Sequence, residues 1–256
     1  MRCIAVISTD ALAGYVDESN GPEGEPLSLA ITVADIKGWG RWGREWLPKI
    51  EKLRGGYRAY KHTTLHPALA DLMVKHTAFS SFINIRESDY HAWFPKWVQS
   101  VIGGPYATGV LFSLMTAAVW SRQHKKRRIF YFVEQGHRNF PHVAFLMSII
   151  MRTEELRTLY AMEGWGAATK EDVPTHCPDT LAHCAAMHFG KESYGTFIDT
   201  LYDADKVWRG NITHEAKNDL VPRLTEVAKL FRRAMRADRK QRDAGRRASR
   251  KKHKGD

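Results

Sequence analysis

The chain has 256 residues, 43% of them hydrophobic, and a formal net charge of +11. A chain of this length can bury a large core, and no apolar run approaches the ~20 residues of a membrane helix, so we expect a soluble protein and not a membrane-spanning one. Three cysteines, an odd number, argue against a disulfide scaffold and for a reducing compartment, the cytoplasm.

The first predicted element is a strand that ends in two carboxylates. The apolar residues 13–16 lead directly into Asp17 and Glu18, and Asn20-Gly21-Pro22 then marks a turn. Acids at strand ends are often only solvated, but they lie at the rim of a sheet, where ligands and metals can reach them.

A second strand, over 27–34, is predicted to pair with the first as a hairpin. Several shorter elements follow, and their composition indicates their type. These are helices over 39–53 and 66–76, a third strand over 78–86, and a short aromatic helix that Ser88 caps and that ends at Trp97.

A buried strand in the middle of the chain also ends in an acid. The longest apolar stretch, 105–124, predicts a central helix. The β-branched and aromatic residues 128–133 then lead into Glu134 and a turn at Gly136.

A third acid stands at the start of a late helix. A helix over 139–154 and a fifth strand over 156–162 are followed by a predicted turn at Gly164-Trp165-Gly166. Pro178 and Asp179 then suit the first turn of a helix. The order of elements predicts an α/β protein with a mixed β-sheet flanked by helices.

Three segments resemble a known family. Residues 15–20 (Tyr-Val-Asp-Glu-Ser-Asn) resemble the Asp-Glu-Ser-Gly signature of the family called "domain of unknown function 3800". Residues 132–137 are similar to its second acidic strand, and residues 178–183 to its late segment, an acid followed by a helix rich in leucine and alanine. The resemblance covers roughly residues 1–190 and implies a ribonuclease H-like fold.

This resemblance implies that Asp17, Glu134 and Asp179 converge on divalent metal ions, Mg²⁺ or Mn²⁺. Hard cations take oxygen ligands, and two of them about 4 Å apart can serve both ends of an in-line phosphodiester displacement. Asp17 would bridge the ions, and Glu134 and Asp179 would each hold one. A regular strand points Glu18 to the opposite face from Asp17, so we expect Glu18 in a supporting or turn position.

Two other contributors to the site stay open. Lys170 falls near a lysine that the family often carries, and it either neutralises a phosphate or is a solvated loop lysine. The resemblance leaves the fourth metal ligand open between His62 and His66.

A second group of metal-binding residue types lies within the thirteen residues 176–188: His176, Cys177, His183, Cys184 and His188. Cys184 and His188 are four apart and would share a helix face. Zinc accepts such ligands, but the segment has no Cys-x-x-Cys pair, and Cys177 precedes the predicted helix. Packing or capping roles are therefore favoured over zinc binding and over a cysteine nucleophile.

Most of the positive charge lies at the C-terminal end. Residues 231–254 hold twelve cationic residues against Asp238 and Asp243. An apolar stripe from Leu220 at helical spacing stops at Met235, so we expect a basic helix and then a disordered tail. Such an arm favours nucleic acid through counterion release, although a solubilising role or an acidic protein partner is the alternative.

The domain organisation and function follow from these features. We expect a ribonuclease H-like domain over 1–215 with an insertion at about 38–100, and a basic C-terminal helix and tail over 216–256. The predicted function is that of a divalent-metal-dependent nuclease acting on DNA or RNA. One alternative is a non-catalytic adaptor subunit of a nucleoprotein assembly, and another is a phosphatase for a small phosphoester. Carboxylates repel a polyanion unless a metal intervenes, which favours the nuclease.

Overall fold

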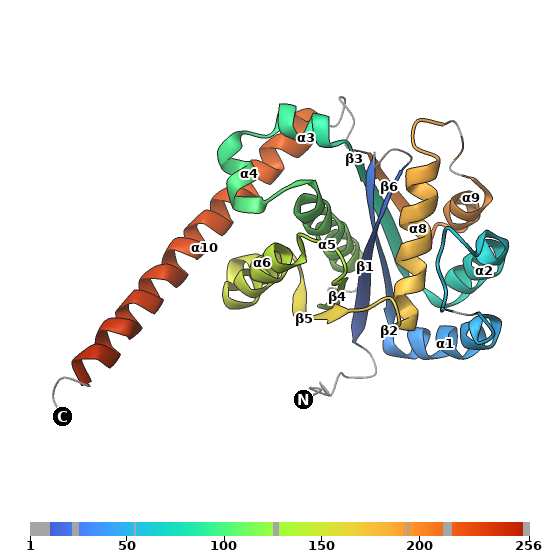
Figure 1. Ribbon diagram of the computed structural model, residues 1–256, viewed down its shortest axis with the longest axis horizontal. Coiled ribbons are helices and arrows are strands. Elements are labelled where there is room, and N and C mark those ends of the chain that lie inside the picture. The colour runs from blue at the N-terminus through green and yellow to red at the C-terminus, as the bar shows by residue number, and fades with distance from the viewer. Residues whose placement is uncertain are drawn as a thin grey trace.

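The computed structural model describes residues 11–21, 26–53, 55–124, 128–191, 193, 195–211 and 217–252. Within these ranges, six strands form one mixed sheet in the order β5-β4-β1-β2-β3-β6 (Figure 1). β1 pairs antiparallel with β2, and β2 with β3, whereas β4 runs parallel to β1, β5 to β4 and β6 to β3. The strands are β1 (Leu12–Asn20), β2 (Leu27–Asp35), β3 (Phe79–Ile85), β4 (Ile129–Glu134), β5 (Met162–Ala168) and β6 (Val207–Asn211).

Helices cover both faces of this sheet, as the sequence predicts (Figure 1). One layer consists of α1 (Ile36–Ile50), α2 (His66–His76), α8 (His176–Met187) and α9 (Gly195–Asp203). The other contains α5 (Pro105–His124), α6 (Phe140–Arg152) and α10 (Lys217–Lys252), with the short helices α3 (Glu87–Trp93), α4 (Lys96–Ile102) and α7 (Glu154–Leu159) around them.

Each layer has its own hydrophobic core against the sheet. In α1, the indole rings of Trp39, Trp42 and Trp46 are buried on one side of the helix, as their spacing predicts. In α5, apolar side chains are buried all round the helix, because it lies between the sheet and the outer helices. None of the helices in the described ranges has by itself the length and hydropathy of a membrane span, and the one pair that passes together, α4 and α5, is bent by 72°.

The predicted fifth strand is misplaced. Residues 154–159 form helix α7, and the strand β5 runs through Gly164-Trp165-Gly166, where a turn is predicted. The glycines are required here because the aromatic rings of β4 lie across them: a Cβ on Gly164 would overlap the Phe130 ring, and one on Gly166 would lie 3.3 Å from Phe132. Their low strand propensity is thus offset by packing.

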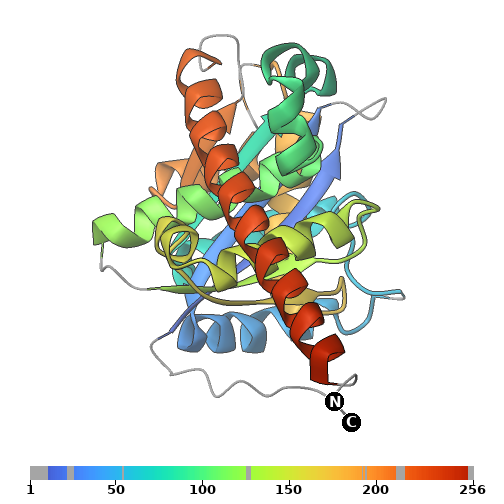
Figure 2. The ribbon, with the colours of Figure 1, turned by 90° about the vertical axis from the view of Figure 1, so that its left-hand side faces the viewer.

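Two other boundaries differ from the prediction. The aromatic helix does not continue through Trp97, because Pro95 separates α3 from α4. The basic helix extends beyond the end of its apolar stripe at Met235, since α10 continues as a helix to Lys252; residues 216 and 253–256 of the predicted helix and tail lie outside the described ranges. Figure 2 shows α10 crossing in front of α5 and α6.

The course of α10 has a physical explanation. Leu224, Val227 and Phe231 are buried in the core, and the apolar contacts end at Met235, as the sequence predicts. Beyond that point the helix gains an ion pair between Asp238 and Arg152 of α6, at 3.1 Å. The distal sequence is rich in arginine, lysine and alanine, which are good helix formers.

A pair of glycine substitutions tests how closely α5 lies on the sheet. A Cβ on Gly109 of α5 would overlap Leu29 of β2 and lie 3.2 Å from Ile85, whereas one on Gly43 of α1 would meet no atom within 4 Å. We expect Gly109→Ala to lower the free energy of unfolding by about 1–3 kcal/mol, and Gly43→Ala to raise it by up to ~1 kcal/mol. Urea denaturation measures both, and equal stabilisation by the two changes would contradict the packing of α5.

Candidate metal centre

The strand pairing brings two acids together at one edge of the sheet. β1 and β4 are parallel neighbours with Val16 opposite Val133, so Asp17 and Glu134 each follow directly after this pair. Both side chains are buried, with 1% and 3% of their surface exposed. An oxygen of each lies within 4.8 Å of the other and of a Glu18 oxygen. Three carboxylates on two strands therefore form one group, which we call the acid cluster.

Glu18 belongs to the acid cluster, so its predicted supporting position on the opposite face is wrong. Pairing of β1 with β4 ends at Val16, while its pairing with β2 continues to Asn20. Oδ1 of Asp17 accepts a hydrogen bond of 2.8 Å from the backbone N–H of Glu18, the next residue along the chain.

The acid cluster holds two oxygens for which the described part of the chain offers no hydrogen-bond partner. These are Oδ2 of Asp17 and Oε2 of Glu18, both buried. Burial, then the charges of Glu18 and Asp179, raise the pKa of Asp17 well above its ordinary value. Burial and the charge of Glu134 raise the pKa of Glu18 to about 7. A buried charge without a partner is costly, and a cation between the carboxylates would remove that cost.

Glu134 is held by the turn that follows it. Its Oε2 accepts a hydrogen bond of 2.7 Å from the backbone N–H of Gly136. A Cβ at Gly136 would lie 2.8 Å from Oε1, so only glycine lets the turn approach the carboxylate this closely. The Tyr106 hydroxyl donates to the backbone carbonyl of Glu134 at 3.3 Å. Sequence reasoning missed Tyr106, because nothing in the apolar pattern of its helix separates it from a core residue.

Asp179 lies beside the acid cluster and is not a member of it. It occupies the first turn of α8, as predicted, and its Oδ2 accepts a hydrogen bond of 3.3 Å from the backbone N–H of Ala59. Its charge helps to raise the pKa of Asp17. The structure thus brings three carboxylates close together at this edge of the sheet. The third of them is Glu18, whereas the sequence predicts Asp179.

Lys170 is half-buried near all four acids. Burial alone would lower the pKa of its ammonium group, but the charges of Asp17, Asp179, Glu18 and Glu134 outweigh burial and raise it. The side chain therefore keeps its positive charge beside the acid cluster.

Neither histidine considered as a fourth ligand is in the acid cluster. Nε2 of His66 lies 3.0 Å from the backbone carbonyl of Ala59, and its Nδ1 lies 3.7 Å from Sγ of Cys184. His62 stacks on Tyr57, and its Nδ1 accepts from the N–H of Arg58 at 3.0 Å. Both hold the loop that contacts Asp179.

The alternative zinc group does not converge. The acid cluster is the one set of three or more potential ligands found within 4.8 Å in the described part of the chain. His176 accepts a hydrogen bond from the Trp46 indole at 3.0 Å, and burial raises the pKa of the Cys184 thiol to about 12. These side chains pack in the core, in agreement with the role favoured from the sequence.

The metal-free protein should become less stable as the pH rises. Burial raises the pKa of Glu18 from 4.5 to about 7, so between these values the folded protein binds more protons than the unfolded protein. Stability therefore falls as the pH rises through this window. Melting temperatures in EDTA between about pH 5 and 8 should decrease, and Glu18→Gln should flatten the decrease. An equal slope in both proteins would mean that Glu18 is solvated.

No protein-family model matches this chain, and no curated protein matches it.

Proposed function

We propose that this protein is a divalent-metal-dependent nuclease with a ribonuclease H-like fold, acting on phosphodiester bonds of DNA or RNA in the cytoplasm. One observation carries the proposal: Oδ2 of Asp17 and Oε2 of Glu18 are buried, find no hydrogen-bond partner among the described residues, and lie beside Glu134. Native proteins rarely leave buried carboxylates in this state, and an ion provides the missing partner.

The topology supports the fold assignment. The strands β3-β2-β1-β4-β5 are neighbours in that order, with the first three antiparallel and β4 and β5 parallel to β1. This is the arrangement expected of a ribonuclease H-like sheet, with β6 added beside β3. Acids lie within the first strand and at the end of the fourth, and Asp179 lies in the first turn of a later helix, in the order that the family resemblance implies.

The donor atoms fit Mg²⁺ or Mn²⁺. Asp17, Glu18 and Glu134 offer only carboxylate oxygens, the ligands that hard cations prefer, and Asp179 is near enough for its charge to raise the pKa of Asp17. When bound, such an ion would activate water and stabilise the departing oxyanion. The chain itself supplies the ammonium group of Lys170, which remains charged beside the acids and is placed to pair with a phosphate oxygen.

Helix α10 supports a polymeric substrate. Its exposed residues Arg236, Arg239 and Lys240 present positive charge outside the core, as expected of a surface that contacts a polyanion. The same surface would suit a non-catalytic adaptor. An adaptor has no use for buried, unpartnered carboxylates, and a phosphatase for small phosphoesters has no use for a basic helix.

Cleavage assays separate these functions. Purified protein is incubated with matched DNA and RNA in Mg²⁺, in Mn²⁺ and in EDTA. We expect cleavage of at least one polymer with either ion and none in EDTA. Binding without cleavage under every condition would favour the adaptor, and hydrolysis of small phosphomonoesters alone would favour the phosphatase.

A further inference from the structure

A groove adjoins the acid cluster at Glu18, and Asp179 is not among its lining residues. Its volume is about 530 Å³, within the ~300–1,000 Å³ of sites for small ligands. Glu18 forms one end, and residues from the start of α5 and from the turn after β4 form a wall that includes Tyr106, His137 and Arg138. The groove therefore has the volume of a site for a small ligand, and it shares Glu18 with the site proposed for the chemistry.

His137 is held in one orientation and one tautomer. Its ring stacks on Tyr106, with centroids 3.8 Å apart and planes 13° from parallel. Its Nδ1 accepts a hydrogen bond of 3.0 Å from the backbone N–H of Asn139, so the ring proton resides on Nε2. Burial and the charge of Arg138 lower the pKa of His137, which keeps the ring neutral. The groove wall thus carries a fixed N–H donor.

Arg138 adds a cation next to this donor. Its side chain is exposed, and in the described part of the chain no carboxylate forms an ion pair with it. A guanidinium group and a neutral N–H together match the oxygens of a phosphodiester. The acid on the opposite wall, Glu87, lies 3.5 Å from His91, and Glu18 is assigned to the metal.

We propose that this groove binds the backbone of a single polynucleotide strand next to the scissile bond, with Nε2–H of His137 and the guanidinium of Arg138 on the adjacent phosphate. This assignment rests on the proposed nuclease function. His137 and Arg138 position the strand and take no part in bond breaking, so their loss should affect KM more than kcat.

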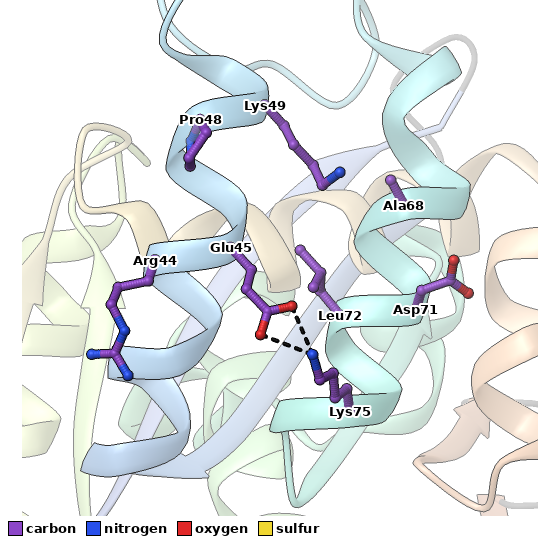
Figure 3. Close-up of a pocket in the computed structure, with 8 residues that line it drawn as sticks. All are labelled: Arg44, Glu45, Pro48, Lys49, Ala68, Asp71, Leu72 and Lys75. Carbon is purple, nitrogen blue, oxygen red and sulfur yellow. Dashed lines mark hydrogen bonds and ion pairs between the residues drawn. The ribbon is translucent and has the colours of Figure 1, made fainter.

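A second cavity provides the control. It lies between α1 and α2, where Glu45 is paired with Lys75 at 2.9 Å and Arg44 lies to the side of this pair (Figure 3). None of its lining residues belongs to the acid cluster. Arg44→Gln therefore removes an arginine from the surface without touching the groove.

The test compares three variants on a single-stranded oligonucleotide. His137→Phe keeps the stacking on Tyr106 and removes the donor, and Arg138→Gln removes the charge. We expect each to raise KM roughly tenfold, as for loss of a hydrogen bond to a charged group, while kcat falls less than about threefold. Arg44→Gln should leave both within about twofold. Arg138→Gln decides the test if His137→Phe fails to fold.

Oligonucleotide binding at equilibrium, measured with each groove change added to Asp17→Asn, distinguishes a wrong groove assignment from a wrong nuclease function. If wild-type protein cleaves nothing but the groove changes still weaken oligonucleotide binding, the nuclease function is wrong and the groove assignment stands. If wild-type protein cleaves and neither change alters KM or binding, the groove assignment is wrong. A loss of kcat at constant KM would also overturn it, because His137 would then act on the reacting atoms.

Discussion

Asp17→Asn should lower metal-dependent cleavage by roughly three orders of magnitude or more, equivalent to over ~4 kcal/mol of transition-state stabilisation. The amide has the size of the carboxyl group but lacks its charge, so the metal loses its most buried ligand. Affinity for nucleic acid should be retained or increased, because a repulsive charge is removed as well. Single-turnover cleavage and equilibrium binding measure the two effects. Full cleavage by the variant would mean that the activity arises elsewhere.

The same change should stabilise the metal-free protein. Asp17 is buried, and burial raises its pKa well above the ordinary value, so the folded state is disfavoured once the carboxyl group ionises. In EDTA at about pH 8, Asp17→Asn should melt several degrees above wild type, and the gain should shrink as the pH is lowered. Asp203→Asn changes an exposed acid on α9 and serves as the control, for which we expect no change in melting temperature. Destabilisation by Asp17→Asn would show that the contacts of the carboxylate in the fold, among them the N–H of Glu18, outweigh the cost of burying its charge.

Removing residues 239–256 should produce the second large effect, a loss of affinity for every nucleic acid sequence alike. The deletion removes nine cationic residues and leaves Asp238 with its Arg152 partner. Binding to phosphate carries no base information. The slope of log K against log salt should therefore become shallower by about 0.7–0.9 for each phosphate that the deleted residues neutralise. The melting temperature should change little, because the apolar contacts of α10 end at Met235.

A salt titration of binding, on matched DNA and RNA, measures the slope for full-length and shortened protein. Arg152→Gln breaks the ion pair with Asp238 without shortening the helix, so it separates any effect of disturbing that pair from the effect of removing positive charge. An unchanged slope in the shortened protein would favour an acidic protein, instead of nucleic acid, as the partner of the basic helix.

The sequence alone predicted an element correctly where the residues of that element determine its type or its ends. Helix α5 has the predicted bounds, Pro105–His124, because a proline opens a long apolar run. β2 and β3 agree within one residue of the predicted 27–34 and 78–86, since their β-branched and aromatic residues favour buried strands. The parallel alignment of β1 and β4 then brings Asp17 beside Glu134.

The errors arose where neighbours in space decide the structure. β5 contains two glycines that favour a turn, but it pairs with β4, and the rings of Phe130 and Phe132 lie against those glycines. Glu18 lies in the acid cluster, although a regular strand predicts the opposite face. Asp179 lies in the predicted helix turn, but its carboxylate accepts from the backbone N–H of Ala59 and is not in the cluster.

The continuous helix α10 has a consequence for how the protein responds to its ionic surroundings. Its 36 residues correspond to a rod of about 54 Å. Arg236 and Lys240 are four residues apart, and the sequence repeats that spacing between arginines at positions 242, 246 and 250. Like charges at this spacing cost a helix about 0.2–0.5 kcal/mol per pair. A polyanion bound by α10, as proposed, would neutralise these charges and stabilise the helix, and by linkage a more stable helix would bind the polyanion more tightly. The helix content of α10 and the fraction of protein bound to polyanion would therefore rise and fall together.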